Sequence, residues 1–173
     1  MLKILFSFVC LLAAMRVAVA SRGDPEKDLP SRTPPAFQVP KGWKAIAADS
    51  VVSARFQIGE GDRIAMVTVT GLPRDGGGLA ANLNRWRKQL GLKELPEKDA
   101  LSSFKAIKVD GVDAHFVDLT GPVGTDEAAQ RILVVIAKSS ELTWFFHLKG
   151  PASLVADQAS GFDVFAKSVR FKK

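Results

Sequence analysis

The side chains suited to acid–base chemistry are few in this chain: two histidines, His115 and His147, and a scatter of carboxylates. Asp113 and His115 lie two positions apart, so in a β-strand both point to the same face of a sheet. An aspartate that orients a histidine occurs in many hydrolytic sites, and a nearby hydroxyl would complete one. The chain has no Gly-x-Ser-x-Gly turn to supply that hydroxyl. We therefore predict no catalytic residue, and an exported hydrolase built on this pair is the alternative.

The sequence supports a metal or cofactor site even less than it supports a catalytic pair. The histidines are not part of a His-x-x-x-His or Glu-x-x-His motif, the spacings that bring two ligands to one face of a helix. The single cysteine, Cys10, lies in the apolar stretch near the N-terminus. The sequence therefore predicts no metal site and no cofactor.

Residues 64–92 read as a strand, a glycine-rich turn and a helix, an order that also occurs in phosphate-binding loops. Gly71 and Gly76 have the spacing of the two glycines of that motif. Gly77 and Gly78 stand where the motif needs lysine followed by serine or threonine, and Asp75 would repel an anion. We therefore interpret the glycines as a structural turn, with Asp75 as an acid near the start of the helix and Gly91 as its left-handed end.

The predicted helix has an apolar side and a basic side. Its apolar residues recur at helical spacing and define a stripe that must be buried: Leu79, Leu83, Trp86 and Leu90. The other side and its flanks carry the densest set of hydrogen-bond donors in the chain: Asn82, Asn84, Arg85, Arg87 and Lys88. We predict that these five residues form a partner-binding surface, and an ordinary solvated helix face is the alternative.

Trp43, Trp86 and Trp144 could stack on sugars or bases if they were exposed. Trp86 belongs to the apolar helix stripe and Trp144 precedes two phenylalanines, so we expect these rings in the core. The chain has no tyrosine. Nucleic-acid binding is therefore not expected, whereas the mild positive charge permits binding to acidic polymers as a further alternative.

The first 20 residues have the features of a secretory signal peptide. Lys3 precedes an apolar run over residues 4–15, and Ala18-Val19-Ala20 offers small residues for cleavage after Ala20. The apolar run is shorter than the ~20 residues that span a bilayer, so no transmembrane anchor is expected in the mature chain, and a retained anchor is the alternative. Removal of Lys3 and Arg16 lowers the net charge of +6 to +4. We expect a periplasmic or secreted protein.

The remaining chain divides into a spacer and a domain. Residues 21–36 are polar and rich in proline, which predicts a flexible spacer. Residues 37–173 carry alternating or apolar runs typical of strands, with Asp110-Gly111 as a hairpin turn and one helix at the C-terminal end. The pattern predicts a single α+β domain: a mostly antiparallel sheet of six to eight strands with two main helices packed on it.

Several short segments resemble a family of small exported bacterial proteins without an assigned activity, many of them lipoproteins. They are Trp43, residues 76–78, residues 82–92, residues 117–121, and residues 143–146 with Leu148 and Gly150. The likeness covers residues 37–171. More distantly, the arrangement is similar to the PsbP-like fold, an antiparallel sheet between helices whose members act mostly as binding or assembly factors. Cys10 lacks the residues of a lipoprotein motif, in contrast to the lipoproteins of the family.

These observations favour a non-catalytic exported module. The resemblance and the absence of a reaction motif imply binding or assembly, and the basic helix side offers the contact surface. We expect the partner to be a protein or another component of the cell envelope.

Overall fold

The computed structural model describes residues 33–122, 129–139 and 142–172. The predicted signal peptide, residues 1–20, lies outside the described residues, as does most of the predicted spacer. The first described link to the domain is a β-bridge between Ala36 and Arg170. The segment just before residue 37 therefore already contacts the domain.

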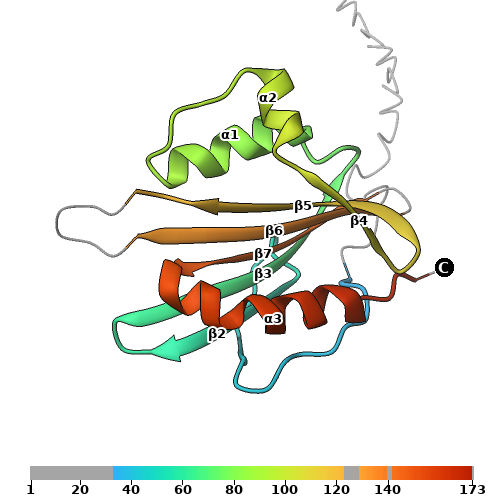
Figure 1. The fold of residues 1–173 in the computed structure, drawn as a ribbon. Coiled ribbons are helices and arrows are strands. Elements are labelled where there is room, and N and C mark those ends of the chain that lie inside the picture. The colour runs from blue at the N-terminus through green and yellow to red at the C-terminus, as the bar shows by residue number, and fades with distance from the viewer. Residues whose placement is uncertain (1–32, 123–128, 140–141, 173) are drawn as a thin grey trace, which may run out of the picture.

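The domain is built on one antiparallel sheet of seven strands in the order β1-β2-β3-β7-β6-β5-β4 (Figure 1). The strands are β1 (Lys44–Ile46), β2 (Ala54–Glu60), β3 (Arg63–Pro73), β4 (Lys105–Val109), β5 (Val112–Thr120), β6 (Gln130–Ser139) and β7 (Leu142–Pro151). Every neighbouring pair is antiparallel. The predicted strand number and sheet type are confirmed.

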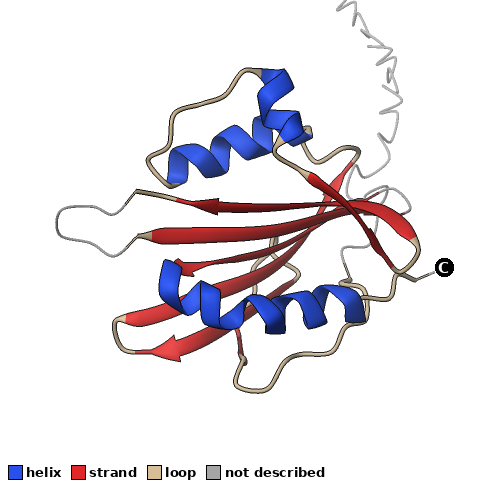
Figure 2. Ribbon diagram, in the orientation of Figure 1, coloured by secondary structure: helices blue, strands red, loops and turns tan. Residues whose placement is uncertain are grey.

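Three helices in the described part of the chain cover the two faces of this sheet (Figure 2). They are α1 (Leu79–Gln89), α2 (Glu97–Ser102) and α3 (Ala152–Ser168). The first two lie on one face and α3 lies on the other (Figure 1). The α+β class is confirmed, with α1 and α3 as the two long helices.

The central strands explain why the sheet is covered on both sides. In β6, all residues from Ile132 to Ala137 are apolar, and β7 carries Trp144, Phe145 and Phe146 in succession. All of these central side chains are buried. A strand that is apolar on both faces is stable only between two layers, and the helices on the two sides of the sheet provide them.

Each layer has its own core. On the α3 side the core joins the helix to alternate residues of the sheet and is rich in aromatic rings, with Phe146, Phe162 and Phe165 fully buried. On the α1 side the core is mostly aliphatic, and Leu83, Trp86 and Leu90 pack against β5, β6 and β7. The predicted burial of the helix stripe and of all three tryptophans is confirmed.

The hairpin turn at residues 110–111 is also confirmed. Asp110 has φ 48° and Gly111 has φ 81°, the positive values that a two-residue type I′ hairpin requires. Val109 and Val112 close the turn as partners. Gly91 likewise has φ 69° directly after the helix, as predicted.

Three local expectations need correction. Asp75 is not an acid of the first helical turn; its carboxylate accepts a hydrogen bond from the Gly77 amide within the glycine turn. The apolar Val169 and Phe171 favour a short final strand in the sequence, but the structure reduces it to the bridge at Arg170. The short strand β1 was not predicted, because its three residues are exposed and lack an apolar alternation.

Candidate functional site

The five residues predicted on the basic side of α1 fall into two groups. Three have internal hydrogen-bond partners, namely Asn82, Asn84 and Arg87, and two are exposed cations, namely Arg85 and Lys88. Asn82 is only 3% exposed, so the expectation that it belongs to the solvent side is wrong. Its amide donates hydrogen bonds to the carbonyls of Gly76, at 2.9 Å, and Gly78, at 2.8 Å. Asn82 therefore holds the glycine turn against the helix.

Asn84 and Arg87 fasten the segment that follows the helix. The Asn84 side chain accepts a hydrogen bond from the Leu95 amide and donates one to the Leu95 carbonyl, both at 2.9 Å. The Arg87 Nε donates to the carbonyl of Lys93 at 2.7 Å. Two of the predicted contact residues thus already have internal hydrogen-bond partners.

Arg85 and Lys88 are the exposed cations of this surface. The sequence of α1 contains no acidic residue, and among the described residues no carboxylate forms an ion pair with either cation. Arg85 donates one hydrogen bond, from Nη1 to the Asn82 Oδ1 at 2.8 Å. This bond orients the guanidinium and leaves its other donors available.

A groove of about 230 Å³ lies beside Arg85, where α1 meets β3 and β7. On the sheet side, its wall combines the polar Thr68 and Thr70 of β3 and His147 of β7 with the apolar side chains of Leu72 and Phe145. On the helix side, Arg85 and Gln89 reach the same groove. The groove exists because α1 packs on β5, β6 and β7, which leaves this face of β2 and β3 without a helical cover.

His147 is the titratable group most affected by this location. Its Nε2 is buried and forms no hydrogen bond with any described residue. Burial, with a smaller contribution from the charge of Lys149, lowers the pKa of His147 to about 4. The ring is therefore neutral near pH 7.

The His115 and Asp113 pair does not have the geometry of a catalytic pair. The Asp113 carboxylate is bound to the Lys108 ammonium at 2.6 Å, and the His115 ring contacts the edge of Phe104. Within the described ranges, no hydrogen bond joins His115 to Asp113. The attraction of Lys108, and more weakly of His115, keeps the pKa of Asp113 below its usual value, which does not favour a proton-transfer role. The hydrolase alternative loses its structural basis at these residues.

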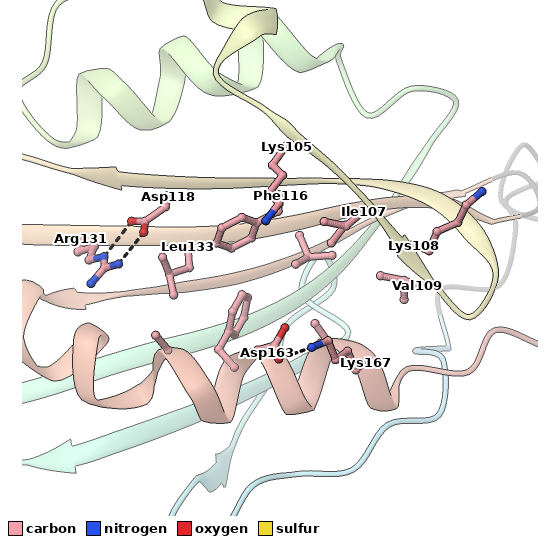
Figure 3. A pocket seen from close by; sticks show the side chains of 14 residues that line it. Lys105, Ile107, Lys108, Val109, Phe116, Asp118, Arg131, Leu133, Asp163 and Lys167 are labelled. Atoms are coloured by element: carbon pink, nitrogen blue, oxygen red, sulfur yellow. Dashed lines mark hydrogen bonds and ion pairs between the residues drawn. The ribbon is translucent and has the colours of Figure 1, made fainter.

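A second cavity of about 230 Å³ lies on the opposite face of the sheet, between α3 and strands β4 to β6 (Figure 3). Its inner wall is apolar, and charged side chains lie around it. The lining residues are Lys105, Ile107, Lys108, Val109, Phe116, Asp118, Arg131, Leu133, Val135, Ala159, Phe162, Asp163, Ala166 and Lys167.

The position of α3 explains this cavity. The helix makes its main contacts with β3, β6 and β7, so β4 and β5 extend beyond it. Ala159 and Ala166 flank the buried Phe162 on the side of α3 that lines the cavity. Two small residues at these positions leave unfilled the volume that larger side chains would occupy.

Two ion pairs lie among the residues around the cavity. Arg131 donates to both carboxylate oxygens of Asp118, at 2.8 and 2.5 Å, and these hydrogen bonds raise the pKa of Arg131. Lys167 binds Asp163 at 2.6 Å, one helical turn away. These cations are already neutralised by neighbouring acids.

Sequence reasoning missed this second cavity. Nothing in the sequence links Asp118 to Arg131, and they meet only because β5 and β6 pair in this register. The one sequence feature that could have indicated a recess is the small residue on either side of Phe162, at positions 159 and 166. Alanine is also a common helix former, so that pattern by itself is not specific.

In residues 33–122, 129–139 and 142–172, no three histidine, cysteine, aspartate or glutamate side chains gather closely enough to hold a metal ion. None of the helices in that part of the chain is both long and apolar enough to cross a bilayer.

Comparison with solved structures shows that the fold is PsbP-like. Over 79% of this chain and 85% of the other, the protein is similar to the PsbP protein (CyanoP) of Synechocystis sp. PCC 6803, with 19% identity and a TM-score of 0.51. It is also similar to LpqN of Mycobacterium tuberculosis, a protein involved in cell envelope biogenesis, over 88% of both chains, with 13% identity and a TM-score of 0.50.

A third similar structure, from Bacteroides thetaiotaomicron, matches 79% of this chain and only 44% of its own length, with 10% identity and a TM-score of 0.48. No protein-family model and no curated protein matches the sequence. At these identities the similarity establishes the fold, and the function has to be argued from the sites.

Proposed function

We propose that this protein is an exported, non-catalytic binding module that holds a protein or another envelope component against the basic side of α1. The observation that carries the proposal is the pair of exposed cations, Arg85 and Lys88, on a helix without an acidic residue. Surface cations that lack acidic neighbours attract an acidic patch on a partner and speed its association.

In this proposal, the contact surface consists of Arg85, Lys88 and the groove beside Arg85. Asn82, Asn84 and Arg87 have internal hydrogen bonds, so we assign them a structural role: Asn82 orients Arg85, and Asn84 and Arg87 fasten the segment after the helix. The groove beside Arg85 adds the hydroxyls of Thr68 and Thr70 and the neutral ring of His147. An acidic side chain of the partner that entered this groove would meet several hydrogen-bond donors.

The export and envelope parts of the proposal rest on different observations. The leader-like residues 1–20 favour export. LpqN, which has the same fold, is involved in cell envelope biogenesis, and this agrees with a role in the envelope. In the described part of the chain, Asp113 is bound to Lys108 and the His115 ring contacts Phe104, and these contacts favour binding over hydrolysis.

The test is a pull-down from an envelope fraction with three tagged proteins: the unaltered chain, Arg85→Glu/Lys88→Glu, and Lys41→Glu/Lys172→Glu. The third protein has the same change in charge at exposed lysines outside α1. We expect the first double variant to lose the partner and the second to retain it. Binding should also weaken as salt rises, because exposed charges are screened over about 10 Å at 0.1 M. Retention of every partner by Arg85→Glu/Lys88→Glu contradicts the proposed surface.

A further inference from the structure

The cavity between α3 and strands β4 to β6 has a different chemistry from the surface of α1. Its innermost residues are buried and apolar: Val109, Leu133, Val135 and Phe162 are each at most 2% exposed. Well-packed cores leave few voids larger than a water molecule. An apolar recess of about 230 Å³ is therefore a feature to explain.

The volume indicates the size of an occupant. The recess of about 230 Å³ is larger than the ~150 Å³ apolar cavity that stays dry and takes up benzene. It is smaller than the ~300 Å³ at which pockets for drug-sized ligands begin. The occupant is therefore a single narrow apolar group, such as one acyl chain of medium length.

The charges around the cavity indicate the head group. Four cations and two acids line it, and three of the cations have partners. Arg131 pairs with Asp118, Lys167 with Asp163, and Lys108 with Asp113 outside the cavity. Among the described residues, no acid forms an ion pair with the fourth cation, Lys105.

Lys105 is well placed to meet the charged end of a ligand. It lies directly opposite Phe116 on the neighbouring strand, and residues opposite each other in an antiparallel pair share one face of the sheet. Figure 3 shows the Lys105 side chain extending toward Phe116, whereas Lys108 points away from the cavity. An unpaired ammonium therefore lies beside an aromatic ring of the apolar wall.

We propose that this cavity binds a single-chain anionic amphiphile, a medium-chain fatty acid, with its tail between α3 and the sheet and its carboxylate at Lys105. The apolar wall and the cavity volume accommodate the tail. The unpaired cation beside the wall provides charge complementarity for the head. This site is independent of the α1 surface, so the failure of one proposal leaves the other intact.

The first test is calorimetric titration with hexanoate, octanoate, decanoate and dodecanoate, each below its critical micelle concentration. Affinity should rise roughly fourfold for each added methylene until the cavity is full, because each buried methylene contributes a constant increment. Longer chains should then gain little. Absence of binding across the whole series overturns the proposal.

The second test fills the cavity. Ala159→Leu extends a side chain into the recess and should weaken decanoate binding by roughly tenfold or more, since it displaces several methylenes of the tail. Ala156→Leu makes the same change at an exposed position of α3 and should leave binding unchanged. Circular dichroism checks that both variants fold. A folded Ala159→Leu that retains the affinity of the unaltered protein rules out the cavity as the site.

The third test addresses the head group. Lys105→Gln should weaken decanoate binding about two- to fivefold, the loss expected for an exposed ion pair, whereas Lys98→Gln on α2 should not. Equal binding of decanol and decanoate by the unaltered protein would show that the charge plays no part, and would overturn the anionic assignment.

Two further measurements test where decanoate binds and whether a second copy of the chain occupies the cavity instead. Methyl resonances of Leu133 and Val135 should shift when decanoate is added, whereas those of Leu83 in the other layer should not. Sedimentation should show a monomer. A dimer that Ala159→Leu dissociates means that a second copy of the chain occupies the recess, which contradicts the fatty-acid proposal.

Discussion

The two layers that cover the sheet differ in composition and in what they leave uncovered. On the α3 side, the core is organised around Phe165, whose ring packs against Phe37, Trp43, Phe56, Phe146 and Phe162. On the α1 side, Leu83 is the fully buried centre of a mainly aliphatic cluster with polar groups at its border. The same sheet therefore supports one aromatic and one aliphatic core.

Each layer also leaves part of the sheet without a helix, with different results. Where α3 stops short of β4 and β5, the exposed strand faces are apolar and an apolar cavity forms. Where α1 stops short of β2 and β3, the hydroxyls of Thr68 and Thr70 on β3 lie beside His147 of β7, and a groove with polar groups in its wall forms. The residues on the uncovered strands, together with the helix residues beside them, decide which ligand each side can hold. Five predictions test this difference.

The largest expected effect is on the aromatic core. Phe165→Ala should lower the free energy of unfolding by about 4 kcal/mol, because it removes a buried ring and leaves a cavity. Denaturant unfolding measures the change. A loss below about 2 kcal/mol would mean that the surrounding rings collapse into the space and that this core is less rigid than its ring contacts indicate.

The matched change in the other layer is Leu83→Ala. We expect a loss of about 3 kcal/mol, since the side chain is fully buried but has fewer atoms than phenylalanine. Leu101→Ala on α2 is the control, because Leu101 is 44% exposed and its loss should be within about 0.5 kcal/mol. If Leu83→Ala is more costly than Phe165→Ala, the α1 layer is the more important for stability.

The polar border of the α1 layer should make stability depend on pH. The pKa of His147 is about 4 in the folded protein and about 6.5 in an unfolded chain. Between these values the unfolded state binds the additional proton, so the stability contribution is complete above pH 6.5 and is lost as pH falls toward 4. We expect a loss of about 2 kcal/mol, less than the full shift implies, because the ring is only half-buried.

The measurement is urea unfolding from pH 7.5 to pH 4 for the unaltered protein and for His147→Gln, which cannot titrate. The difference between the two proteins isolates the histidine from the carboxylates that titrate in the same range. If the free energy of unfolding changes with pH in the same way for both proteins, the environment of His147 does not favour the neutral ring.

Asn82→Ala tests the connection between the glycine turn and α1. The change removes two hydrogen bonds to the carbonyls of Gly76 and Gly78 and should lower the free energy of unfolding by about 1–2 kcal/mol. It should also weaken partner binding slightly, since Arg85 loses its acceptor. The replacement Asn82→Asp retains the size but not the donors, and thermal unfolding should show a similar loss.

The smallest effect is expected at the exposed cation of the same helix. Lys88→Glu places an acid in the last turn of α1, where the helix dipole disfavours negative charge, and should destabilise the protein by about 0.5 kcal/mol. A thermal scan at low salt measures it. A much larger loss would mean that Lys88 has a structural role, which would weaken its assignment to a binding surface.

Much of the fold could be predicted because its determinants are local. The alternation of residues 51–58, the Asp110-Gly111 turn and the stripe of leucines around Trp86 each depend on neighbours in the chain. The polar face of α1 was predicted less well. Asn82 borders the buried stripe. It is buried only because the glycine turn packs beside it and accepts a hydrogen bond from its side-chain amide.

The sequence by itself determined the antiparallel sheet with its two long helices and the basic character of α1, and its leader-like start predicts export. Tertiary structure alone decided which polar side chains of α1 have internal hydrogen-bond partners and where the helices leave the sheet uncovered. Strand register brought Asp118 beside Arg131, and the placement of α3 opened the cavity near Lys105. Periodicity describes one element at a time, whereas a site forms where side chains from several elements meet.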